Sequence, residues 1–276
     1  MVSREGQKTV TALVVNVVLP CNIVIAFMTE LSPELLKDCA VILVVSLVIQ
    51  AGGVLYGKFA YKGQERGRQN CLRYGIICSN AGFLGNPVAE GLYGPTGLML
   101  ASIYLIPQRI MMWSEGLRIF SGESDGKKLV RKVLLHPCII ACIIGCILMA
   151  GQLRLPEWIY RPVNTLGRCN TALSMMVIGM ILAEVDPKNL VDKTVVRYTV
   201  DRLVIIPLVV LIACRICGFS HIVTGLSVIL AAMPCGATTT MLAVQYRSDP
   251  EFATKLVVFS TLCSIPSICV WSLLLH

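Results

Sequence analysis

The sequence predicts an all-α membrane protein that crosses the bilayer several times and contains an internal repeat. Three observations predict this class. The 276-residue chain is 55% hydrophobic and only 14% charged, whereas a soluble domain carries about 25% charged residues. Apolar runs near the ~20 residues that a spanning helix needs recur along the whole chain. Finally, the chain resembles itself when it is shifted by 154 residues.

Nine membrane spans are predicted, and several of them contain Gly or Pro, which helices buried in a membrane protein tolerate. In order, the spans are 10–28, 38–57, 70–91, 94–117, 133–151, 165–183, 194–217, 220–245 and 253–275. No hydrophilic stretch is long enough to form a second, soluble domain.

Three positions recur 154 residues later in the chain: Asn16 as Asn170, Glu30 as Glu184, and Pro33 as Pro187. Residues 1–132 would then form a first repeat with four spans, and residues 133–276 a second repeat with five, together making one membrane domain. Because five spans separate the matching positions, the second copy is expected to be inverted. Inverted repeats are typical of secondary transporters, whose site lies where the repeats meet.

The net charge of +8 predicts orientation rather than nucleic-acid binding, because the basic residues gather on one side of the predicted membrane. Loops on the side of residue 1 carry Arg4, Lys8, Lys58, Lys62, Arg66, Arg68, Arg118, Lys127, Lys128, Arg131, Lys132, Lys188, Lys193, Arg247 and Lys255. The opposite loops carry Lys37, Arg154 and Arg161. Cytoplasmic loops hold the excess of Lys and Arg. The protein is therefore expected to lie in the plasma membrane, with its N-terminus in the cytoplasm and its C-terminus outside.

Two spans contain sequence that cannot remain a uniform α-helix. One is "SNAGFLGNPVAEGLYG" (Ser79–Gly94) and the other "AAMPCGATTTMLAVQY" (Ala231–Tyr246). Gly lowers helix propensity, and Pro removes one N–H and clashes with the preceding turn. At the helical rise, Asn80 lies about 15 Å and Pro234 about 21 Å inside its span. Paired breaks near the membrane midplane indicate a transport site, although two packing kinks would give the same pattern.

Three segments of the sequence resemble the auxin efflux carrier family of prokaryotes. These are "LVVNVVLPCNI", "NAGFLGNP" and "AAMPCGATTTMLAVQYRSDPEFATKLVVFSTLCSIPS". The resemblance covers essentially the whole chain. It implies ten helices in two inverted five-helix repeats, with the fourth and ninth helices broken and crossing near the midplane. It also implies an organic anion as substrate, and it implies that Pro87 and Pro234 mark the crossing.

The chain departs from this family pattern because it starts where the family's second helix starts. The resemblance therefore implies either that the first helix is missing or that the chain is a nine-helix variant. It further implies that spans 10–28, 133–151 and 165–183 form a fixed scaffold, which could supply a homodimer contact. The remaining spans would form the moving transport part.

Polar groups and freed backbone N–H groups at the two breaks predict the anion site. Half-helix N-termini carry partial positive charge and suit a carboxylate. The predicted site comprises Asn80, Gly82, Gly85, Asn86, Pro87, Arg109, Pro234, Gly236, Thr238, Thr239 and Thr240.

Two charged residues within the spans have alternative interpretations. Arg109 could complement an anionic substrate, or it could pair with Glu90 or Glu115 or contact a backbone carbonyl. Glu90 is a candidate for coupling transport to H⁺ or Na⁺, or else a structural counter-charge. Arg197 and Asp201 are spaced i,i+4 and are expected to form a simple ion pair.

We therefore predict a secondary transporter for a small organic anion such as a carboxylate. A membrane receptor or sensor without transport, or an inactive truncated carrier, remains an alternative. No enzyme is expected, because the chain has no H-E-x-x-H, G-x-S-x-G or Walker motif. The thirteen cysteines lie mostly within apolar spans and predict packing rather than a disulfide framework. No metal or cofactor is predicted.

Overall fold

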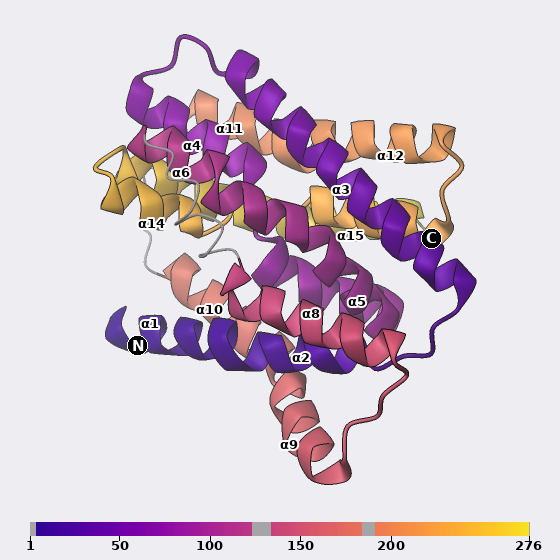
Figure 1. Cartoon of the computed structure of the whole chain (residues 1–276). Coiled ribbons are helices and arrows are strands. Elements are labelled where there is room, and N and C mark those ends of the chain that lie inside the picture. The colour runs from indigo at the N-terminus through magenta and orange to yellow at the C-terminus, as the bar shows by residue number, and fades with distance from the viewer. Residues whose placement is uncertain (1–3, 123–133, 184–190, 276) are drawn as a thin grey trace.

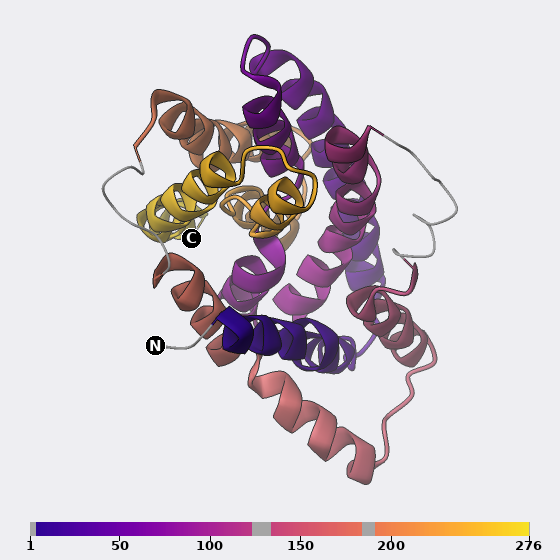
Figure 2. The same cartoon turned by 90° about the vertical axis from the view of Figure 1, so that its left-hand side faces the viewer.

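A computed structural model describes residues 4–122, 134–183 and 191–275, and every regular element within these ranges is helical. Figures 1 and 2 show the arrangement from two directions. The first half contains α1 (Arg4–Leu13), η1 (Val14–Val18), α2 (Leu19–Ala26), α3 (Pro33–Ala60), α4 (Arg66–Ile77), η2 (Ala81–Gly85), α5 (Asn86–Trp113) and α6 (Glu115–Ser121). The second half contains α8 (Pro137–Ala150), α9 (Glu157–Arg168), α10 (Asn170–Ala183), α11 (Lys193–Val200), η4 (Asp201–Ile205), α12 (Ile206–Ile216), α13 (His221–Ala231), α14 (Thr238–Gln245) and α15 (Pro250–Leu275).

The surface of these helices is apolar in the way a membrane requires. Within the described part of the chain, three helical runs are long and apolar enough to cross a bilayer, namely Thr9–Ala26, Pro33–Ala60 and Pro250–Leu275. Large apolar side chains on α3 and α12, including Val48, Phe59 and Val209, are exposed. A water-soluble protein rarely exposes so much apolar surface, so these faces are suited to contact lipid.

Helical elements cover each of the predicted spans, but several spans are built from more than one element. The run α1–η1–α2 covers the first predicted span, and α11–η4–α12 covers the seventh. In α5, Gly94 has φ +63° and ψ −157°, which separates a short helix from the long one that follows. Glycine suits this position because residues with a Cβ rarely adopt such angles.

Helix α9 was not predicted, since the sequence placed residues 152–160 in an outer loop. It projects from the body of the molecule in both views (Figures 1 and 2) and packs against α2. Its sequence is polar on average and contains Pro162, and its Trp158 is 76% exposed. A helix of only 12 residues with this composition does not give the long apolar signal on which the spans were predicted.

A buried apolar cluster joins α2, α5, α8 and α13 and holds the centre of the fold together. Phe27, the residue directly after α2, is completely buried against α8 at Gly145. A Cβ added at Gly145 would lie 2.6 Å from the Phe27 ring, so only glycine lets the two helices approach this closely. The cluster fixes α2 beside the helices that carry the broken segments.

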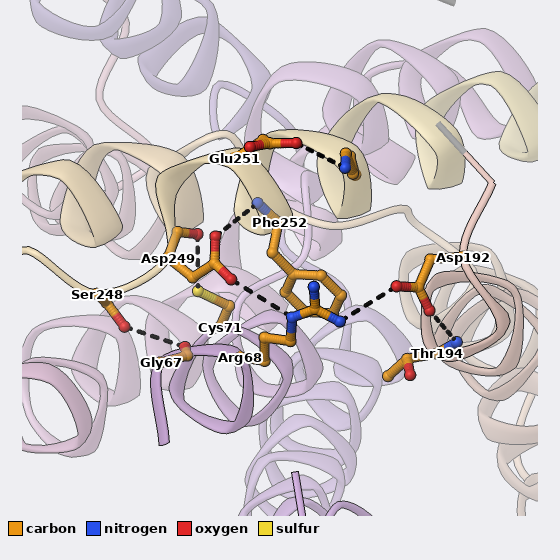
Figure 3. A network of polar contacts seen from close by, with 10 residues as sticks. Gly67, Arg68, Cys71, Asp192, Thr194, Ser248, Asp249, Glu251 and Phe252 are labelled. Carbon is orange, nitrogen blue, oxygen red and sulfur yellow. Dashed lines mark hydrogen bonds and ion pairs between the residues drawn. The ribbon is translucent and has the colours of Figure 1, made fainter. Parts of the chain in front are cut away.

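Arg68 connects the start of α4 to two helices of the second half (Figure 3). Its Nη1 atom lies 3.2 Å from Asp192 Oδ2, and its Nε atom lies 3.5 Å from Asp249 Oδ2. The guanidinium also stacks over the Phe252 ring, 4.9 Å from its centroid. These contacts hold three helices of both sequence halves at one end of the molecule.

Both aspartates in this network also bind backbone N–H groups at helix starts. Asp192 accepts a hydrogen bond from the Thr194 N–H at α11, and Asp249 accepts one from the Phe252 N–H at α15. Such caps satisfy N–H groups that have no partner within the helix. Nearby, Lys255 Nζ lies 2.7 Å from Glu251 Oε1.

Candidate functional site: two broken helices that meet

Two unwound segments, one from each sequence half, lie against each other inside the molecule. Cys78–Asn80 separates α4 from η2, and 232–237 separates α13 from α14. The Asn80 N–H donates to the Pro234 carbonyl at 2.8 Å, and the Gly236 N–H donates to the Cys78 carbonyl at 3.0 Å. The two segments thus form a short antiparallel bridge, here called the crossing. A Cβ at Gly236 would lie 3.0 Å from the Cys78 carbonyl oxygen, so glycine allows the close approach.

The crossing includes some of the predicted site residues but not Pro87. Asn80, Pro234 and Gly236 lie within it, whereas Pro87 lies in the first turn of α5. The helix is continuous at this point, since Gly85 and Asn86 both have αR angles, and the wider π-helical turn η2 directly before Pro87 accommodates the N–H that proline lacks. The expectation that Pro87 marks the crossing is therefore wrong. The residue opposite Pro234 is Asn80, which precedes it by 154 positions.

Polar side chains from the following helices hold each unwound segment in place. Gln108 of α5 accepts a hydrogen bond from the Ser79 hydroxyl at 3.1 Å and donates to the Ser79 carbonyl at 2.8 Å. Ser260 of α15 accepts a hydrogen bond from the Cys235 N–H at 3.1 Å. Neither Gln108 nor Ser260 was predicted. The available signal was a polar side chain inside an apolar span, which is expected to face a partner rather than lipid.

Arg202 of η4 connects the two broken helices. Its Nε atom donates to the Met233 carbonyl at 2.9 Å, and its Nη1 atom donates to the Ile76 carbonyl at 3.0 Å. The side chain is only 4% exposed. The Ile76 carbonyl lies in the last turn of α4, and the Met233 carbonyl lies two residues after the end of α13. Each helix dipole places roughly half a negative charge at such a C-terminal end. One guanidinium thus offsets two helix ends.

The sequence predicted the i,i+4 pair beside Arg202 but not the role of Arg202 itself. That pair exists, with 4.0 Å between Arg197 Nε and Asp201 Oδ2. Asp201 also accepts a hydrogen bond from the Tyr61 hydroxyl at 2.9 Å. The signal for Arg202 was its place in the middle of an apolar run, where a charge requires a partner.

The three threonines after the crossing have different environments. Thr238 accepts a hydrogen bond from the Tyr74 hydroxyl at 3.1 Å. The Thr239 hydroxyl lies 3.2 Å from the Cys235 sulfur and is completely buried. Thr240 is partly buried, and its hydroxyl makes no hydrogen bond to another residue that the structure describes. Of the three, Thr240 has the most freedom to bind a ligand.

Beyond the crossing, the half-helix formed by η2 and the start of α5 carries the remaining predicted residues. A Cβ built at Gly82 meets no atom within 4 Å, so space is open beside the helix start. Gly85 packs tightly against Leu230 and Met233. Asn86 is 0% exposed, and neither its Oδ1 nor its Nδ2 atom has a hydrogen-bond partner. A buried amide with no partner is rare and calls for an explanation.

Arg109 lies beside Cys138 and Cys142 of α8 and is 6% exposed. Its Nη1 atom has no hydrogen-bond partner. Glu115 lies within 4 Å of Arg73 and Arg118 instead. The ion-pair interpretation of Arg109 therefore finds no support among the described residues.

Glu90 accepts a hydrogen bond from Asn22 Nδ2 at 3.1 Å. Since Asn22 lies on α2, this contact links the N-terminal helical run to the half-helix after the crossing. Within the described ranges, no group of three or more potential metal ligands gathers.

A bundle of apolar helices with two broken helices meeting inside it defines a polytopic membrane transport protein. Comparison with known sequences agrees with this class. Residues 1–272 match the family described as "Membrane transport protein", and the chain belongs to this family, which includes the auxin efflux carriers.

Three related proteins are named as transporters or as a component of a carrier. An uncharacterized transporter of Methanothermobacter thermautotrophicus is 26% identical over 284 residues, covering 100% of this chain and 91% of its own length. A second, from Methanocaldococcus jannaschii, is 22% identical and covers 100% of this chain and 92% of its own length. A probable auxin efflux carrier component of Oryza sativa is 23% identical over 147 residues, covering 53% of this chain and 40% of its own length.

Replacing Arg202 tests how far the crossing depends on it. We expect Arg202→Met to lower the free energy of unfolding by roughly 3 kcal/mol, because two carbonyls lose a charged donor. Arg202→Lys should retain part of the stability by keeping the charge. Thermal melting in one detergent would measure both, with Arg215→Met, at an exposed position of the same helical run, as the control. If Arg202→Met melted at the same temperature as the parent and the Arg215→Met control, the role of Arg202 would be contradicted.

Proposed function

We propose that the protein is a secondary carrier of a small organic anion such as a carboxylate, with its site at the crossing. The observation that carries this proposal is Asn86, a fully buried amide without a partner, one helical turn from the open space at Gly82. An anion seated there would accept a hydrogen bond from the amide. It would also be within the influence of the N–H groups at the start of the half-helix.

The positions of the broken-helix ends around the crossing also support an anion as the substrate. Arg202 occupies the C-terminal ends of the two broken helices, so their negative ends are already offset. The N-terminal ends, at Ala81 and Thr238, carry partial positive charge and have no acidic side chain in their first turns. The name of the rice relative, which refers to an organic acid, is compatible with this substrate class.

Transport is proposed to proceed by alternating access between two groups of helices. The 154-residue offset between Asn80 and Pro234 supports two inverted repeats, residues 1–132 and 133–276. The moving part would consist of spans 38–57, 70–91, 94–117, 194–217, 220–245 and 253–275. The remaining spans would stay fixed and could form a homodimer contact. The Asn22–Glu90 hydrogen bond would join the two groups in the state described here.

The site proposal predicts that Asn86→Leu weakens transport without weakening the fold. An isosteric apolar side chain removes an unsatisfied amide, which is neutral or stabilising. Losing a hydrogen bond to an anion costs about 1.5–3 kcal/mol, so the apparent affinity should fall about tenfold or more. Uptake of labelled carboxylates into proteoliposomes, measured across a panel of small mono- and dicarboxylates, provides the test.

Gln50 offers a matched control for Asn86. It is also a buried amide, on α3, and its Oε1 atom has no hydrogen-bond partner. Gln50→Leu should leave the apparent affinity unchanged, while Asn86→Asp should abolish uptake by placing a negative charge at the site. If both Asn86 variants took up the anion at the parental rate, the substrate would bind at a site that does not include Asn86. Saturable binding of a carboxylate without any uptake would instead favour a receptor.

Glu90 is proposed as the group that couples transport to H⁺ or Na⁺. It is a partly buried carboxylate with a single amide donor, and it lies at the contact between the two helix groups. Glu90→Gln can preserve this contact but cannot change charge. We expect the variant to exchange labelled for unlabelled anion at parental rates, while uptake driven by a cation gradient is lost. Gradient-driven uptake at the parental rate would leave Glu90 a structural residue.

Orientation is proposed from the basic loops, which place residues 58–69 in the cytoplasm and 152–160 outside. A cysteine introduced at Gln64 should resist a membrane-impermeant thiol reagent in intact cells and react after permeabilisation. A cysteine at Gln152, which lies in an exposed turn, should react in both conditions. The exposed native cysteines, such as Cys217, must first be replaced. The reverse labelling pattern would invert the topology.

A further inference from the structure

A cavity of about 480 Å³ lies between α3 and α12, on a face of the bundle that the proposed anion site does not use. Both helices lie on the same side of the molecule (Figure 1), and Ile76 of α4 also lines the space. Its volume falls within the range of about 300–1,000 Å³ that is usual for small-molecule sites. Val48 and Val209, on opposite walls, are exposed, so the cavity opens toward the apolar exterior.

Arg202 is the only charged residue among the described residues that line this cavity. A guanidinium has five N–H donors, and the Nε and Nη1 atoms of Arg202 each donate one to a carbonyl. Its Nη2 atom has no hydrogen bond to another residue of the described chain. No described carboxylate pairs with Arg202 either, because the adjacent Asp201 contacts Tyr61 and Arg197.

The depth of Arg202 limits what can reach it. It is the tenth residue of the helical run that begins at Lys193, which places it about 14 Å from the start of that run at the helical rise. The headgroup of a bilayer lipid would have to leave the membrane surface to contact it. A ligand whose whole body enters the cavity can bring an anionic group to this depth without that cost.

We propose that the cavity binds a lipophilic monocarboxylate of the fatty-acid class. The carboxylate would accept hydrogen bonds from the free N–H groups of Arg202, whose planar fork matches a carboxylate. The hydrocarbon chain would lie along the valine-rich walls of α3 and α12. An uncharged acyl chain could pack against the same walls, but it would leave the free N–H donors of Arg202 without a partner. Since Arg202 also holds Ile76 and Met233, such a ligand would bind directly behind the crossing.

Trp271 provides a local probe of this site. Its indole N–H donates to the Leu203 carbonyl at 2.8 Å, one residue beyond Arg202. In a protein with Trp113→Phe and Trp158→Phe, Trp271 is the only tryptophan, because the chain has three. Energy transfer from Trp271 to cis-parinaric acid, in phosphatidylcholine nanodiscs, would then report a fluorescent fatty acid in the cavity. The methyl ester of the same acid serves as the uncharged probe.

We expect saturable transfer from Trp271 to the acid, with at least tenfold higher affinity than for the ester. Gly52 lines the cavity, and a Cβ built there meets no atom within 4 Å, so Gly52→Phe should fill the space without disturbing the fold. This variant should weaken binding of the acid at least tenfold. Gly179→Phe, at an equally open glycine of α10 outside the cavity, should bind the acid like the parent.

Two results would overturn the proposal. Equal affinities for the acid and the ester would show that an uncharged acyl chain fills the groove and that Arg202 takes no part. Parental affinity of Gly52→Phe, with melting unchanged, would show that the acid binds elsewhere. Both results concern the fatty acid alone, so neither depends on whether the protein transports an anion at the crossing.

Discussion

The fold depends on bringing two helix C-termini together inside an apolar interior, an arrangement that is unfavourable on its own. The end of a helix leaves carbonyl groups without partners and concentrates partial negative charge. Arg202 donates to one carbonyl from each end, and the backbone bridge between Asn80 and Pro234 satisfies further groups. Because these contacts join elements from both sequence halves, neither broken helix can reach its conformation independently of the other.

This arrangement divides the crossing electrostatically. One side holds the helix C-termini and is offset by a fixed cation, while the other holds the starts of η2 and α14. Interior sites of low dielectric strengthen every charge interaction. Burying the Asn86 amide costs free energy while the site is empty, because the amide has no hydrogen-bond partner. That burial becomes favourable only when a ligand completes the hydrogen bonds. The same low dielectric that penalises the empty site would favour its occupied state.

Much of the fold could be predicted from the sequence because lipid imposes a long apolar signal on each spanning helix. The positions of the two breaks also followed from local chemistry, since Gly, Pro and Asn lower helix propensity wherever they gather. The partners of the breaks could not be predicted in this way. Gln108, Ser260 and Arg202 act across long sequence separations, and their roles depend on which helices become neighbours. Sequence similarity between repeats is also a limited guide, since Asn16 is exposed whereas Asn170 is buried.

Among the described residues, π-helical segments interrupt two helical runs, at η1 and η4, and a third segment, η2, begins the half-helix that continues into α5. Such a segment accommodates one residue more than an α-helix of the same length would hold. Removing one residue from η4 would therefore let the run continue as regular α-helix of the same length, and α12 would keep its orientation relative to α11. Side chains such as Val209 and Ile212 would remain exposed to lipid. Within this family, π-helical segments should therefore absorb single-residue insertions and deletions without changing which helix face meets the membrane.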